Sequence, residues 1–209
     1  MYTKIKRLMD IILSLLGTII LSPILITLII AIKIDSRGPV LFKQKRIGIN
    51  KTYFKILKFR TMRIDAPKDT PTHLLSNPDQ YITKVGKFLR KTSLDELPQI
   101  LNILLGEMSI IGPRPALWNQ YNLISERDKY GANNVLPGLT GWAQINGRDE
   151  LPIEIKAKLD GEYVQNISLI MDMKCFFGTV ISVVKRDGVV EGGTGVKDEL
   201  ASSKESISK

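Results

Sequence analysis

The longest apolar stretch of the chain lies near its N-terminus. Residues 11–32 carry no formal charge and are mostly leucine and isoleucine. A straight helix of this length would be about 33 Å long, which is enough to cross a bilayer. Pro23 lies in the middle of the run, where proline removes a backbone donor and kinks a helix, and the adjacent Ser22 hydroxyl can serve the freed backbone group. This pattern fits both a kinked spanning helix and two short arms that enter and leave on one face.

Basic residues flank the apolar run on both sides. Residues 1–63 hold thirteen of the thirty lysines and arginines but only two acidic residues, so the whole positive excess of the chain lies there. Positive flanks favour the cytoplasmic side of a membrane. Because both flanks are positive, we expect a re-entrant membrane helix over residues 1–36, followed by a catalytic domain over residues 37–190 and a flexible polar tail over residues 191–209.

The apolar pattern then changes to that of strands. Residues 40–47 and 53–62 read as a β-hairpin with a short turn, and residues 64–80 read as a loop with three prolines. Lys58 and Arg60 are two positions apart on the second strand, so they are expected to point to the same side. A solvated strand face would give the same pattern.

A helical pattern follows over residues 97–105. Its apolar positions predict a helix that begins near residues 93–95 and ends at Gly106, which places Asp95 and Glu96 at the positive end of the helix dipole. Ser93 and Glu96 also match a capping box, which would make the two acids ordinary stabilisers of the helix start. Arg90 lies one turn earlier, so a metal-bridged phosphate is the alternative interpretation of the same residues.

Later segments add two rigid turns and two helices. Arg114 lies between two prolines, which hold its backbone stiff, and residues 137–148 form a shaped loop that ends in Arg148. Residues 154–164 and 172–184 have helical patterns. The second helix has an apolar face that fits either a protein core or a lipid surface. That face comprises Phe176, Phe177, Val180, Val183 and Val184.

The composition excludes several kinds of site. The chain has one cysteine, Cys175, and one histidine, His73. A disulfide framework and a metal site of several cysteines or histidines are therefore impossible, and a histidine-based triad is disfavoured.

Five motifs in order resemble one family, the bacterial polyprenyl-phosphate sugar-phosphate transferases of the small monotopic class. The motifs are Ser22-Pro23, Phe54-Lys55-x-x-Lys58-Phe59-Arg60-Thr61-Met62, Arg90-Lys91-Thr92-Ser93-Leu94-Asp95-Glu96-Leu97-Pro98-Gln99, Gly112-Pro113-Arg114-Pro115 and Pro137-Gly138-x-Thr140-Gly141. The resemblance covers about residues 1–190. It implies an α+β, helix-dominated monotopic membrane protein with a re-entrant helix-break-helix, a small β-hairpin and amphipathic interface helices, on the cytoplasmic face of the bacterial inner membrane.

The resemblance also implies a reaction. A UDP-sugar would donate its sugar 1-phosphate to undecaprenyl phosphate with release of UMP, as the first committed step of capsule, exopolysaccharide or glycoprotein glycan assembly. Relatives of this size suggest a modified N-acetylated hexosamine as the sugar. Asp95 would be the nucleophile that forms a covalent phosphosugar intermediate, and Glu96 its partner, both on Mg²⁺. The substrate-binding residues would be Lys58, Arg60, Arg90, Arg114 and Arg148.

Elementary chemistry agrees with this reaction. A carboxylate is already ionised at pH 7 and the acceptor phosphate is anionic, so neither half-reaction needs a general base. Membrane lipid is an expected partner and nucleic acid is not, because aromatic residues make up only 7% of the chain and no recognition motif appears. The alternatives are a membrane-anchored nucleic-acid-binding protein and a scaffold subunit, and a homodimer is left open.

Overall fold

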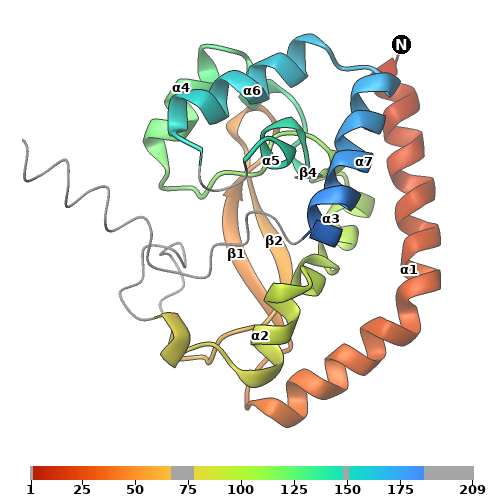
Figure 1. The fold of residues 1–209 in the computed structure, drawn as a ribbon, viewed down its shortest axis with the longest axis vertical. Helices are drawn as coiled ribbons and strands as arrows, with labels where there is room; N and C mark the ends of the chain where they lie inside the picture. The colour runs from red at the N-terminus through yellow and green to blue at the C-terminus, as the bar shows by residue number, and fades with distance from the viewer. Residues whose placement is uncertain (1, 67–77, 148–150, 186–209) are drawn as a thin grey trace, which may run out of the picture.

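The computed structural model describes residues 2–66, 78–147 and 151–185. The predicted polar tail, His73, most of the predicted proline-rich loop, and Arg148 lie outside these residues. The described part is a mixed fold in which helices predominate over two small sheets (Figure 1). The α+β prediction is confirmed at that level.

The N-terminal apolar run belongs to one long helix, α1 (Tyr2–Asp35), which passes through Pro23 without interruption. Figure 1 shows that the helix bends in its second half and curves around the rest of the molecule. Pro23 cannot donate to the carbonyl of Ile19, and the Ser22 hydroxyl donates to that carbonyl instead, at 2.8 Å. The role predicted for Ser22 is therefore confirmed, whereas the predicted break is a bend within one continuous helix.

The start of α1 is bound to the body of the protein. Lys6 forms an ion pair with Asp172, at 2.8 Å, and the Tyr2 hydroxyl donates to the same carboxylate. The next residue, Arg7, donates to the carbonyls of Ile103 and Leu104 at the C-terminus of α3 (Gln99–Leu105), where a cation stabilises the helix end.

The end of α1 is bound to the same body. Leu28 and Ile32 are buried in a cluster with Phe59 and Leu89. Asp35 accepts a hydrogen bond from the backbone N–H of Val85 near the N-terminus of α2 (Lys84–Lys91). An anion at that position stabilises the helix. Both ends of α1 therefore dock on one folded unit.

Between its docked ends, α1 leaves most of its apolar side chains uncovered. The helix is long and apolar enough to cross a membrane, and only 11% of its most apolar 18-residue window is buried. The core helix of a soluble protein would be mostly buried. Helix α7 (Leu169–Lys185) adds a second exposed apolar face, so the predicted apolar face of this helix is not core over the residues whose side chains are described. Those exposed residues are Leu169, Ile170, Met173, Phe176, Phe177, Val180 and Ile181.

The predicted hairpin is confirmed. Strands β1 (Leu41–Ile47) and β2 (Tyr53–Phe59) pair antiparallel and are joined through a short 3₁₀ turn, η1 (Ile49–Lys51). Phe54 and Ile56 on its inner face pack against Ile103 and Met108. The hairpin thereby fixes the end of β2 beside the loop that precedes α3.

A second, smaller sheet was not predicted. Strands β3 (Ser109–Ile111) and β4 (Gly138–Thr140) pair in parallel, so residues 137–148 are not simply a shaped loop but contain β4 and the short helix α5 (Trp142–Ile145). A Cβ on Gly138 would lie 2.1 Å from the amide nitrogen of Gly112, so only glycine allows this close approach. The pairing fixes the turn that follows β3.

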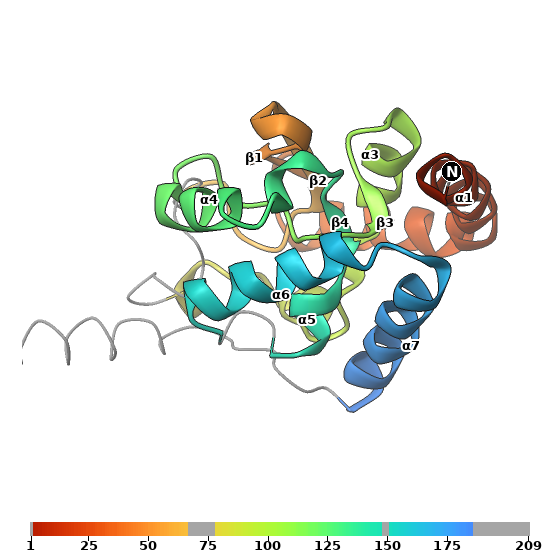
Figure 2. The ribbon, with the colours of Figure 1, turned by 90° about the horizontal axis from the view of Figure 1, so that it is seen from above.

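The remaining elements of the described residues are helical. Helix α4 (Tyr121–Asp128) was not predicted, and short 3₁₀ turns occur at η3 (Pro78–Gln80) and η5 (Ala132–Asn134). Helix α6 (Ile153–Gln165) was predicted, as was α7. Figure 2 shows α6 packed along α5, with α7 following from its C-terminal end.

Candidate active site

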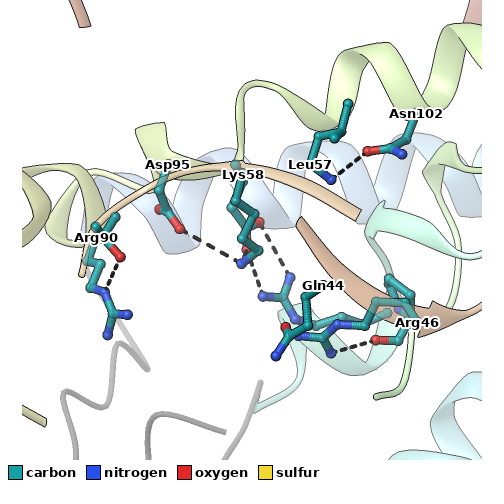
Figure 3. Close-up of polar contacts among 11 residues, drawn as sticks. Gln44, Arg46, Leu57, Lys58, Arg90, Asp95 and Asn102 are labelled. Atoms are coloured by element: carbon teal, nitrogen blue, oxygen red, sulfur yellow. Dashed lines mark hydrogen bonds and ion pairs between the residues drawn. The ribbon is translucent and has the colours of Figure 1, made fainter. Parts of the chain in front are cut away.

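Four of the predicted site residues lie together. Lys58 comes from β2, Asp95 and Glu96 from the 3₁₀ turn η4 (Leu94–Glu96), and Arg114 from the turn after β3. Oε1 of Glu96 accepts from Lys58 Nζ at 2.7 Å and from Arg114 Nη2 at 2.7 Å. Lys58 Nζ also lies 3.8 Å from Oδ2 of Asp95 (Figure 3). Two carboxylates and two cations thus share one partly buried cluster.

The acidic pair is not a helix cap. Ser93 has a left-handed backbone with a φ of 55° and makes no side-chain capping bond, and α3 begins only at Gln99, after Pro98. The helix predicted to begin near residues 93–95 therefore begins later, and the capping-box interpretation is wrong. The Glu96 carboxylate points to Lys58 and Arg114 instead of the backbone.

The two carboxylates are held differently. Burial would raise the pKa of the Glu96 carboxyl, but the ion pairs with Arg114 and Lys58 outweigh it. They hold this pKa well below its usual range. The Asp95 side chain is 14% exposed, and the part of the chain that the structure describes places no hydrogen-bond donor on it. Burial raises the pKa of Asp95, and Lys58 is the strongest opposing influence. Asp95 is thus the less engaged carboxylate of the pair.

The other predicted cations occupy different positions. Arg90 donates from Nε to the hydroxyl of Thr61 at 2.9 Å, and its charge lowers the pKa of Asp95. Arg60 is only 5% exposed, and its Nη2 donates to the backbone carbonyl and hydroxyl of Ser36. Strand β2 ends at Phe59, so the alternation that would place Arg60 beside Lys58 does not continue. The structure does not bring Arg60 into the cluster.

Sequence reasoning missed the residues that support Arg114. Arg46 on β1 donates to the carbonyl of Pro115, and Arg127 on α4 donates to the carbonyl of Arg114. Arg127 is paired with the buried Asp160 of α6. Arginines on a hairpin and on a short helix give no local sign of what they contact.

A metal site of several protein ligands is absent from residues 2–66, 78–147 and 151–185, where no three histidine, cysteine or acidic side chains cluster. Mg²⁺ does not need such a site, since it often binds through one or two carboxylates together with substrate phosphates. The adjacent carboxylates of Asp95 and Glu96 fit that mode.

The sequence of the chain also matches known proteins. The model of the family described as Bacterial sugar transferase matches residues 1–186. The chain belongs to the bacterial sugar transferase family. Within this family, it is 43% identical over 184 residues to the UDP-glucose:undecaprenyl-phosphate glucose-1-phosphate transferase of Escherichia coli, a match that covers 84% of this chain and 39% of that protein.

Other bacterial sugar transferases match over most of their own length. The exopolysaccharide production protein PSS of Rhizobium leguminosarum is 40% identical over 87% of this chain and 96% of its own. The uncharacterized sugar transferase EpsL of Bacillus subtilis is 40% identical over 88% of this chain and 90% of its own. By contrast, the chain spans about two fifths of the length of the glucose-1-phosphate transferases.

Proposed function

We propose that this protein transfers a sugar 1-phosphate from a UDP-sugar to undecaprenyl phosphate and releases UMP. The observation that carries the proposal is the cluster in which Glu96 is fixed by Lys58 and Arg114 while the neighbouring Asp95 carboxylate accepts no hydrogen bond from the described residues. The names of the relatives supply the substrates, since several act on UDP-glucose and undecaprenyl phosphate.

In the first half-reaction, a carboxylate oxygen of Asp95 forms a bond to the sugar-linked phosphorus of the donor. The bond from that phosphorus to the bridging oxygen breaks, and the oxygen leaves with UMP. In the second half-reaction, a phosphate oxygen of undecaprenyl phosphate attacks the same phosphorus and frees the carboxylate. Both nucleophiles are anions, so neither half-reaction requires a proton acceptor.

Charge explains why a cation from outside the chain is needed. The two carboxylates balance Lys58 and Arg114, so the cluster has little net charge to offer a diphosphate. Asp95 and Glu96 would hold Mg²⁺, which supplies charge neutralisation at the phosphates when bound. Arg90 is the next cation, since it is close enough to lower the pKa of Asp95.

The lipid acceptor requires a site at the depth of lipid headgroups. A straight helix of 34 residues would be about 51 Å long, but α1 bends and has both ends docked on one folded unit. We therefore infer that α1 dips into the cytoplasmic leaflet of the inner membrane and returns. The exposed apolar face of α7 would lie in the membrane interface.

The identity of the sugar is a separate question. The names of the relatives point to glucose, whereas the sequence led us to expect an N-acetylated hexosamine. A panel containing UDP-glucose, UDP-galactose and N-acetylated UDP-hexosamines, assayed for UMP release with undecaprenyl phosphate in nanodiscs, decides between them. A scaffold protein would release UMP from none of these donors.

The decisive experiment uses the preferred donor alone. Mass spectrometry of the intact protein should show a phosphosugar adduct on Asp95, with a stoichiometric release of UMP before lipid is added. Asp95→Asn should form no adduct and no product while it remains in the membrane fraction. Full turnover by Asp95→Asn would refute the assignment of the nucleophile.

A further inference from the structure

The turn that carries Arg114 is held by its backbone from two directions. Arg46 Nη1 donates to the carbonyl of Pro115 at 3.0 Å, and Arg127 Nη1 donates to the carbonyl of Arg114 itself at 2.9 Å. Pro113 and Pro115 have no N–H, so the turn can be fixed by hydrogen bonds mainly through its carbonyl oxygens. The carbonyl of Pro113 accepts from the backbone N–H of Gly138, so Arg46 and Arg127 are the side-chain donors that help to set the direction of the Arg114 side chain.

Arg127, which donates to the carbonyl of Arg114, is itself held in place by other contacts. Arg127 is buried on α4, and its Nε and Nη2 bind Oδ2 of Asp160 at 2.8 and 2.5 Å. Asp160 is fully buried on α6, which packs against α4. A guanidinium is a planar group with five N–H donors, so one edge of it can bind a carboxylate while another N–H donates to a carbonyl. Arg127 makes both contacts at once.

We propose that Arg127, oriented by Asp160, is a positioning residue that sets the direction in which Arg114 presents its guanidinium to Glu96 and the donor phosphates. The inference rests on the proposed function, because it assigns Arg127 a role only through Arg114. Arg127 is too deeply buried to touch a substrate. Its effect on the reaction must therefore pass through the backbone carbonyl of Arg114. The side chain of the same residue contacts Glu96 at 2.7 Å.

The energetics of the pair agree with a positioning role. A buried ion pair is a weak source of stability, since well-packed apolar side chains of similar volume often serve as well or better. A buried Arg–Asp pair can also donate a hydrogen bond to the backbone of an active-site turn. That bond fixes the direction of the turn, which apolar packing cannot do. Displacements of about 1 Å in a reacting group can cost on the order of a hundredfold in rate.

The test is a double-mutant cycle between Arg127→Lys and Arg114→Ala, measured as the rate of UMP release in the donor half-reaction. Lysine can pair with Asp160 but lacks the fork that also reaches the Arg114 carbonyl. Arg127→Lys alone should lower the rate by about tenfold to a hundredfold. In the Arg114→Ala background it should change the rate by less than about twofold, because there is no guanidinium left to position.

Lys129→Met is the matched control. Lys129 is an exposed cation two positions after Arg127 and forms an ion pair with Glu126. Its replacement should leave the rate unchanged. If Arg127→Lys lowers the rate by the same factor in both backgrounds, Arg127 does not act through Arg114 and the inference is overturned. If Arg114→Ala alone keeps the full rate, the role of Arg114 in the proposed function fails together with it.

A second variant guards against a folding defect. Arg127→Met/Asp160→Leu replaces the whole ion pair with apolar side chains, which is often neutral for stability. We expect its melting temperature to stay within a few degrees of that of the parent protein. Its rate should fall as much as that of Arg127→Lys. In the Arg114→Ala background, the double replacement should cause no further fall in rate. A parent-like rate in this variant would overturn the inference.

Discussion

At the scale of single residues, the protonation state of Asp95 depends first on its burial and then on Lys58, the strongest of its charged neighbours. Burial raises the pKa of the Asp95 carboxyl, and Lys58, with its Nζ 3.8 Å away, lowers it. The proposed reaction requires the ionised carboxylate, so the rate must fall as the pH drops through that pKa. Lys58 therefore extends the active range of the enzyme toward acid pH.

Lys58→Met should lower the rate of the donor half-reaction by about a hundredfold, since it removes the cation beside Asp95 and Glu96. It should also move the acidic limb of the pH–rate profile to higher pH, because the pKa of Asp95 rises without Lys58. Lys55→Met is the control, as Lys55 is exposed on the same strand. An acidic limb that stays in place would show that Asp95 is not the titrating group.

A second residue-scale prediction concerns Cys175. Burial raises the pKa of this thiol to about 12, and Asp172 adds to the effect. Because the thiolate is the reactive form, the native protein should resist maleimide and iodoacetamide at pH 8. Mass spectrometry should show one adduct only after denaturation in guanidinium. Rapid labelling of the native protein would mean that α7 packs more loosely than the structure indicates.

At the scale of elements, the C-terminus of α3 depends on a side chain from α1. Arg7 donates to the carbonyls of Ile103 and Leu104 in the last turn of α3, where helix carbonyls lack donors from a following turn. The Ile103 carbonyl also accepts from the backbone N–H of Gly106. Arg7→Met should therefore destabilise the protein by about 1–3 kcal/mol, visible as a lower melting temperature in detergent. Lys4→Met removes an exposed cation from the same helix and should have no such effect. Equal melting temperatures for both variants would mean that Arg7 is not an effective cap.

The elements also show how far the sequence could predict the fold. The hairpin, α6, α7 and the stop of α3 at Gly106 follow from local patterns and were predicted. The parallel pair β3–β4 could not be, because each strand has three residues and the pairing joins segments far apart in the chain. In the site, Lys58, Asp95, Glu96 and Arg114 lie in motifs. The support from Arg46 and Arg127 comes from tertiary packing, which leaves no periodic trace in a sequence.

At the scale of the whole molecule, the docking of α1 constrains its path through a membrane. Its first turns are tied to α3 and α7, and its last residue to α2. These elements belong to one folded unit, so a spanning α1 would have to break one set of contacts. The contacts at the N-terminal end include an ion pair and four charge-assisted or hydroxyl hydrogen bonds. Detachment of that end would leave Asp10 and Asp172 without these partners.

We therefore expect both ends of α1 to be labelled from the same side. The silent Cys175 allows single introduced cysteines to be read without a background. Thr3→Cys, in the exposed first turn, and Lys45→Cys, on the exposed hairpin, should both react with a membrane-impermeant maleimide only after cells are permeabilised. The Lys45→Cys variant fixes which side the catalytic unit faces, so the comparison does not depend on cell integrity alone. Labelling of Thr3→Cys, but not Lys45→Cys, in intact cells would establish a spanning helix and would show that the contacts of Lys6 and Arg7 do not form in the membrane.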